Sequence, residues 1–155
     1  MNTDNIQKLT DRLRRLCSRR EYCKSDILKK AVTALEGDRE TAEKVVAVLV
    51  SEKYVDDLRY ATAYAREKAM ISGWGETKIK YMLSGKRIDR DLIAQALTEI
   101  DAGKADTRLI KLLENKARSL RCDPQIRLKL LRFALGRGYQ YDDVQPMVDT
   151  LLKNL

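Results

Sequence analysis

The chain has 155 residues and carries 31 lysines and arginines against 23 aspartates and glutamates, a net charge of +8. A hydrophobic fraction of 44% is normal for a globular protein and argues against intrinsic disorder. There is no histidine and there are only three cysteines (Cys17, Cys23 and Cys122), so histidine-dependent catalysis is excluded and we expect free thiols without a metal or cofactor.

Targeting and catalytic motifs are absent from the sequence. No apolar run approaches the length of a membrane span, so we expect a cytoplasmic protein with no membrane partner. The acidic pairs Asp56-Asp57 and Asp142-Asp143 lie at predicted helix starts, where carboxylates cap free N–H groups. No glycine-rich phosphate loop or nucleophile elbow occurs. We therefore expect a binding protein rather than an enzyme, with no catalytic residues.

The dominant hydrophobic period is helical. Apolar residues step by three and four, as in Ile6, Leu9, Leu13 and Leu16. Asp123 followed by Pro124 reads as an N-cap residue with proline at the first helical position. In chain order the sequence predicts nine helices: Thr3–Arg20, Ser25–Leu35, Thr41–Lys53, Asp57–Ser72, Glu76–Ser84, Asp89–Asp101, Lys104–Leu120, Pro124–Gly136 and Tyr141–Lys153.

An internal repeat groups these helices in threes. The pattern Leu-x-Gly-x-Arg, followed by two spaced apolar residues, occurs over Leu35–Leu49 and again, with identical spacing, over Leu83–Leu97. A looser copy covers Leu135–Val148. Three short amphipathic helices make a thin core, so neighbouring units should stack. We predict an all-α, elongated and curved array of three tandem three-helix repeats, at residues 1–53, 54–101 and 102–155. The alternative is a single nine-helix globule whose turns look alike by chance.

Positive charge is concentrated in two of the three predicted repeats. On a helical projection, the first and seventh helices each present one narrow basic stripe beside an apolar face. A solvated helix face would mix signs, whereas these stripes are single-signed, which favours binding to a polyanion. The first stripe contains Lys8, Arg12, Arg15 and Arg19, and the second contains Lys104, Arg108, Lys111 and Arg118.

Several short motifs occur in a specific order. The middle repeat reads Val-Asp-Asp-Leu-Arg-Tyr-Ala from Val55 to Ala61, followed by a Gly-Trp-Gly turn at residues 73–75. An Arg-Arg-Glu-Tyr segment precedes it at 19–22, and Lys129–Phe133 and Arg137–Asp142 follow it. Together these motifs resemble the RecX family, which regulates RecA recombinase filaments, over about Arg14 to Val148. The sequence departs from the family's pattern at three positions: Arg87 stands where glycine is frequent, Glu76 where proline is frequent, and Cys23 where serine is usual.

The resemblance implies a tandem helical array that binds in the groove of the RecA–DNA filament and limits filament growth, ATP hydrolysis and strand exchange. It implies the RecA filament as partner, with single- or double-stranded DNA secondary, and it supplies no catalytic residues. To the two stripes we therefore add the motif arginines as expected filament- or phosphate-binding residues: Arg59, Arg66, Arg132 and Arg137.

Two other functions remain open at this stage. One is a helix-turn-helix-like module that acts directly on nucleic acid. The third helices of the repeats begin with acidic residues, as at Asp89 and Asp91, which would repel phosphates and argues against recognition helices. The other is a purely structural adaptor.

Overall fold

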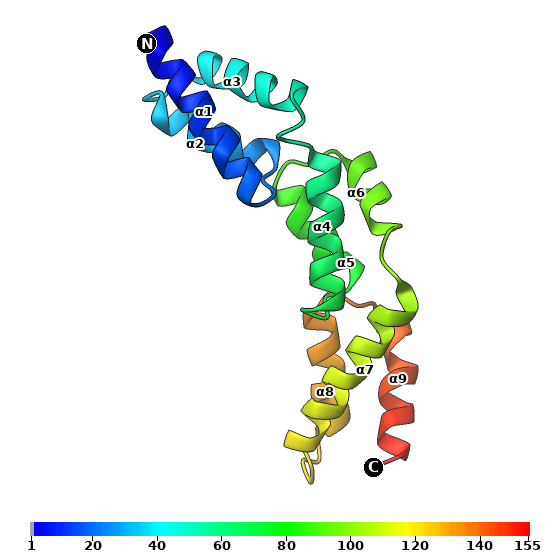
Figure 1. The fold of residues 1–155 in the computed structure, drawn as a ribbon. Coiled ribbons are helices and arrows are strands. Elements are labelled where there is room, and N and C mark those ends of the chain that lie inside the picture. The colour runs from blue at the N-terminus through cyan, green and yellow to red at the C-terminus, as the bar shows by residue number, and fades with distance from the viewer. Residues whose placement is uncertain (1) are drawn as a thin grey trace.

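A computed structural model describes residues 2–155, which form nine helices and no strand (Figure 1). The predicted all-α class is confirmed. The helices are α1 (Thr3–Arg19), α2 (Lys24–Ala34), α3 (Arg39–Ser51), α4 (Asp57–Met70), α5 (Glu76–Gly85), α6 (Arg90–Leu97), α7 (Ala102–Ser119), α8 (Ile126–Gly136) and α9 (Tyr141–Lys153).

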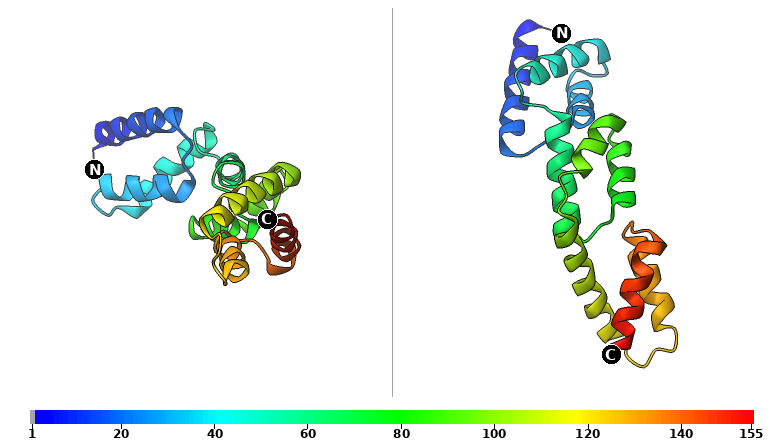
Figure 2. Two further views of the ribbon diagram at one scale, coloured as in Figure 1. Left: turned by 90° about the horizontal axis from the view of Figure 1, so that it is seen from below. Right: turned by 90° about the vertical axis from the view of Figure 1, so that its right-hand side faces the viewer.

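The helices are arranged as three successive groups of three along an elongated body, with the chain ends far apart (Figure 1). Each group has its own core, centred on Leu13 and Leu49 in the first, Ile79 and Leu83 in the second, and Leu113 in the third. The tandem three-helix array is therefore confirmed and the single globule is not found. In the right-hand view of Figure 2, the first helices of the three groups (α1, α4 and α7) follow one another along one long side.

The cores exchange single residues across the predicted repeat boundaries. Cys23 and Ala105, from the first and third groups, both lie in the middle core, while Val55 lies in the first core. Each group is thereby completed by its neighbours, as expected where three helices bury too little surface alone. The boundaries after residues 53 and 101 stay a prediction.

The structural repeat differs from the register suggested by the Leu-x-Gly-x-Arg match. That match pairs Gly37 with Gly85, but Gly37 lies in a turn with φ +94° whereas Gly85 is the last residue of α5. The N-cap residues Asp38 and Asp89 start α3 and α6 and are the equivalent pair. The structural alignment of the first and middle groups is thus shifted by three residues from the sequence match. The reason is that the turn of the middle group begins after its Leu-x-Gly segment, whereas the turn of the first group lies within that segment.

Two predicted helix boundaries are corrected by capping interactions. Helix α8 begins at Ile126, because Asp123 and Pro124 form a preceding turn in which the Asp123 carboxylate accepts from the Gln125 N–H at 2.8 Å. Helix α6 ends at Leu97, because Asp101 serves as the N-cap of α7 and accepts from the Lys104 N–H at 3.0 Å. The predicted cap at Asp56 is confirmed by its bond with the Arg59 N–H.

Polar side chains hold the first group against the second. Lys86 Nζ lies 2.8 Å from Asp26 Oδ1, and the Lys86 carbonyl accepts from Ser25 Oγ at 2.7 Å. The Arg59 guanidinium binds Glu21 and donates to the carbonyls of Lys53 and Tyr54. Charged side chains therefore supply much of the specific contact at this junction.

We expect this junction to be sensitive to acid through Asp26. Burial raises the pKa of the Asp26 carboxyl, whereas hydrogen bonds from Lys86 and Cys23 lower it. The lowering effects together are larger, so the pKa lies below the ordinary value of 3.8. A carboxyl group with a lowered pKa in the folded protein stabilises the fold. This contribution is complete when the pH is above the ordinary pKa and is lost as the pH falls through the lowered pKa. Replacing Asp26 by Asn should cost about 1–2 kcal/mol near pH 7 and flatten the pH dependence of stability below about pH 4.

Urea unfolding at several pH values measures this effect. The Lys86→Met variant should lose the same pH-dependent component, because the carboxylate then lacks its cation. Parallel stability–pH curves for the parent and Asp26→Asn proteins would show that Asp26 does not carry the acid sensitivity.

Main-chain contacts and close packing join the second group to the third. The N–H groups of Gly75 and Thr77 donate to the carbonyls of Arg137 and Gly138 at 2.6 and 3.2 Å. A Cβ at Gly75 would lie 2.4 Å from the Gly138 carbonyl oxygen, so the turns approach at a distance that only glycine permits. Trp74, in the same turn, is partly buried and packs against the middle core.

Candidate polyanion-binding interface

The first basic stripe lies on the outer face of α1. Its four members are exposed, and none forms an ion pair within residues 2–155: Lys8, Arg12, Arg15 and Arg19. Their spacing of four, three and four residues places them within one narrow sector of the helix, beside the face that buries Leu9 and Leu13. The buried face anchors α1, so the cations project from a fixed scaffold.

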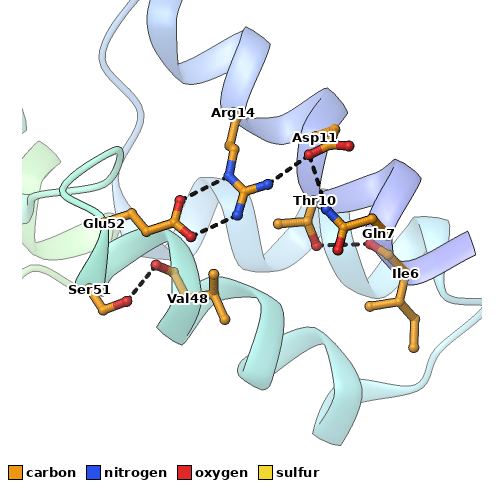
Figure 3. A network of polar contacts seen from close by, with 8 residues as sticks. All are labelled: Ile6, Gln7, Thr10, Asp11, Arg14, Val48, Ser51 and Glu52. Atoms are coloured by element: carbon orange, nitrogen blue, oxygen red, sulfur yellow. Dashed lines mark hydrogen bonds and ion pairs between the residues drawn. The ribbon is translucent and has the colours of Figure 1, made fainter. Parts of the chain in front are cut away.

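Most carboxylates close to this stripe are engaged by other cations, whereas Asp4, one turn before Lys8, is exposed and has no ion pair in the described chain. Residues 3–35 contain nine cations and four acids. The Arg14 guanidinium binds both Asp11 and Glu52, each at 2.7 Å, and so ties α1 to α3 (Figure 3). Its hydrogen bonds are the largest cause of the lowered pKa of Glu52. Glu21 and Asp26 pair with cations of the second group. The stripe therefore keeps its positive potential after folding.

Helix α2 adds cations that the sequence-based interpretation missed. Lys29 and Lys30 line a groove of about 430 Å³ between α1 and α2, together with Arg12 and Thr33. The Lys30 ammonium also lies over the ring of Tyr22, 5.5 Å from its centroid. These two lysines are consecutive in the sequence and therefore do not form a stripe along one face of α2. Only the packing of α2 on α1 reveals that they extend the basic surface.

The second stripe is smaller than predicted. Lys104, Lys111 and Arg118 are exposed on α7, without an ion-pair partner in the described chain. Arg108 is half-buried, and its Nε donates to the Ile71 carbonyl at 3.2 Å. Arg108 is therefore less exposed than the other three cations of the stripe and forms part of the contact between α7 and the end of α4.

The four motif arginines have different surroundings. Arg59 is committed to Glu21 and two carbonyls at the first junction, and Arg66 forms an exposed pair with Glu99 at 3.2 Å. Arg137 donates to the Ser72 carbonyl and lies over the Phe133 ring. Arg132 is exposed without an ion pair in the described part of the chain. The binding roles of these four arginines stay predictions. Arg59 and Arg137 also have a structural role, since their hydrogen bonds join neighbouring groups of helices.

The two stripes belong to helices on the same long side of the molecule (Figure 2). Helix α4 separates them and belongs to a neutral segment, since residues 54–101 contain eight cations and eight acids. Positive charge is therefore concentrated at two places along the body, on α1 and on α7. Such an arrangement binds phosphates through charge without reading base sequence.

The described residues offer little for other chemistry. Among residues 2–155, no group of three or more histidine, cysteine, aspartate or glutamate side chains is placed to hold a metal ion. No helix within the same residues is both long enough and apolar enough to span a bilayer.

Comparisons with known proteins agree with the motif-based resemblance. A family model for the second three-helix domain of RecX matches residues 56–97. The regulatory protein RecX of Clostridium tetani is 31% identical over 119 residues, which cover 74% of this chain and 54% of that protein. The RecX of Bacillus thuringiensis is 29% identical over 110 residues, covering 70% and 41%. A crystal structure of RecX from Lactobacillus salivarius superposes with a TM-score of 0.80 at 22% identity and covers 99% of this chain and 98% of that one.

The chain belongs to the RecX family. A second RecX crystal structure, with a TM-score of 0.82 at 24% identity, covers 94% of this chain and 72% of that one and has the same fold. The chain spans about half the length of the Clostridium relative that it matches. The relatives named here are called regulatory proteins, a name that describes no enzymatic reaction.

The three departures from the RecX pattern have local explanations. Arg87 adopts φ +58°, a conformation that favours glycine, and a non-glycine residue is tolerated there at some cost. Glu76 is the first residue of α5, where proline is favoured and where an acid also suits the helix dipole. Cys23 is the fully buried N-cap residue of α2 and makes no side-chain capping bond, which a serine could provide.

Proposed function

We propose that this RecX-family chain is a regulatory protein that docks on the RecA–DNA filament and restrains its growth, ATP hydrolysis and strand exchange. The observation that carries the proposal is the single-signed stripe on α1, near which Asp11, Glu52 and Glu21 are bound by other cations. The family membership supplies the partner, and the elongated body supplies a shape suited to a long groove.

The direct test is binding to three ligands: RecA–DNA filaments, RecA alone and naked single-stranded DNA. We expect the filament to be bound most tightly, because it offers phosphates and protein surface together. Inhibition of RecA-driven ATP hydrolysis should follow the same titration curve. Equal affinity for naked DNA and filament, without inhibition, would instead support a module that acts directly on nucleic acid, and binding to none of the three would reject both readings.

The second stripe should contribute to the same interaction. Replacing Lys104, Lys111 and Arg118 by Glu leaves the structural residue Arg108 in place, so stability should change by no more than about 0.5 kcal/mol per substitution. Filament affinity should fall, and the slope of log affinity against log salt should flatten by roughly two units, because about 0.7–0.9 units are lost for each phosphate contact. Inhibition of ATP hydrolysis at several salt concentrations measures both effects. An unchanged slope would remove α7 from the interface.

A further inference from the structure

A second groove lies between α2 and α3, and it differs in character from the basic surface on α1. It has a volume of about 540 Å³ and a floor of apolar side chains that includes Leu28, Val46 and Val50. Val50 is 39% exposed, although it belongs to a helix whose other face is buried in the first core. The residues that line it include none of the cations of the α1 stripe, so this groove is separate from that stripe.

The fold does not require apolar residues at these positions. The N-cap residues of α2 and α5 are Cys23 and Gly75, and counting from them places Lys80 of the middle group at the position of Leu28. Helix α6 ends at Leu97, so the middle group has no helical position that corresponds to Val50 near the end of α3. The middle group therefore carries a charged residue where α2 carries the partly buried Leu28, and it has no counterpart of the exposed Val50, so the repeat itself does not require this apolar surface.

The border of this groove is positively charged. Lys24, Arg39 and Arg87 line it together with one acid, Glu43. Glu43 is already paired with Arg39, whose Nε lies 3.2 Å from Glu43 Oε1, whereas the side chains of Lys24 and Arg87 have no ion pair within residues 2–155. An occupant would therefore have to bring apolar side chains for the floor and carboxylates for the border.

We propose that this groove, here called the α2–α3 groove, is a docking site for an acidic amphipathic segment of a partner protein. A helix that presents two or three apolar side chains along one face would fill the floor, as in other helix-in-groove complexes. Carboxylates on the flanks of that helix would meet Lys24 and Arg87, which sets the orientation and selects against basic segments. The site is independent of the filament-binding role proposed for the α1 stripe.

The probe is a fluorescein-labelled synthetic helix with leucines at positions i, i+3, i+4 and i+7 and glutamates on both flanks, followed by fluorescence anisotropy. It should bind at least about tenfold more tightly than a counterpart with lysines in place of the glutamates. It should also bind at least about tenfold more tightly than a counterpart with serines in place of the leucines, because the floor then remains unfilled.

The key variant combines Leu28→Lys, which copies Lys80 of the middle group, with Val50→Asp, which keeps the net charge unchanged. It should weaken binding of the acidic probe by roughly tenfold or more. The matched control combines Val48→Asp with Ile71→Lys, two apolar residues that are 41% and 66% exposed and lie outside the groove. This control should stay within about twofold of the parent, since it removes no groove contact. Circular dichroism confirms that both variants remain helical.

An acidic peptide could also be attracted to the α1 stripe, so the stripe variant with Lys8, Arg12, Arg15 and Arg19 replaced by Glu is included. Unchanged affinity of this variant for the probe places the peptide in the α2–α3 groove. Three outcomes would each overturn the proposal. The stripe variant could lose affinity for the probe, the three peptides could bind with equal affinity, or the groove variant and its control could lose affinity equally. DNA and filament binding are measured separately, so failure here would leave the proposed regulatory function standing.

Discussion

Replacing all four cations of the α1 stripe by glutamate is expected to weaken binding to the RecA–DNA filament by at least about 100-fold at low salt. The variant changes Lys8, Arg12, Arg15 and Arg19. Each contact that a stripe cation makes with a phosphate releases counterions, so losing four contacts should also flatten the salt slope by roughly three units. The fold should persist, because the four side chains are exposed and substitutions at such surface positions change stability little.

The control is a protein with the same change in net charge at other exposed sites: Lys44, Lys53, Arg90 and Lys153 replaced by Glu. If net charge alone governed binding, the two quadruple variants would lose affinity equally. We expect the control to retain most of its inhibition of RecA-driven ATP hydrolysis. Equal losses would show that the stripe has no special position and would reduce the interaction to general electrostatic attraction.

Much of this fold can be predicted from the sequence, because local signals agree with one another along the chain. The helical period defines the buried faces, such as Leu9 and Leu13, and the acidic cap at Asp56 defines the start of α4. The boundaries that failed are those where two signals competed. At Asp123 the capping residue was recognised, but its carboxylate closes a turn before the helix instead of starting it.

The repeat register failed for a different reason. Leu-x-Gly-x-Arg is a turn signal in one group, whereas its copy lies partly within α5, where Gly85 is helical. The sequence similarity correctly indicated that a turn follows the second helix of each group, but it did not give the register of that turn. Glycine is tolerated at the last residue of a helix as well as beyond it. Only the φ values, +56° at Glu36 and +58° at Arg87, identify the equivalent turn positions.

For the candidate interface, the sequence predicts which cations lie on a common helix face but not which of them have structural partners. Arg12 and Arg14 are close in the sequence, yet the first is unpaired and the second binds Asp11 and Glu52. Glu52 comes from α3, 38 residues along the chain, so its pairing depends on tertiary packing. The same holds for Arg108, whose partner is the Ile71 carbonyl, and for the groove that brings Lys29 beside Arg12.

Replacing Gly138 by alanine is expected to cost about 3 kcal/mol or more and to loosen the third group from the second. Gly138 has φ +94°, and a Cβ there would lie 2.4 Å from Lys78 Cβ and 2.5 Å from the Lys78 backbone nitrogen. Backbone strain and a clash with main chain therefore act together. The clash falls between the turns that carry the Gly75–Arg137 and Thr77–Gly138 hydrogen bonds, so relief requires these bonds to lengthen.

Two other glycines separate strain from clash. Gly37 has the same φ of +94° but open space around its Cβ position, so its alanine variant should lose only about 1–2 kcal/mol. Gly136 is the last residue of α8, with no positive φ and no atom within 4 Å of that position, so alanine there should be neutral or should stabilise by up to about 1 kcal/mol. Urea unfolding ranks the three variants. Trp74 is the single tryptophan and lies at the affected junction, so its fluorescence should change at lower urea in the Gly138→Ala variant. If Gly138→Ala lost no more stability than Gly37→Ala, the close approach of the two turns would not hold the second and third groups together.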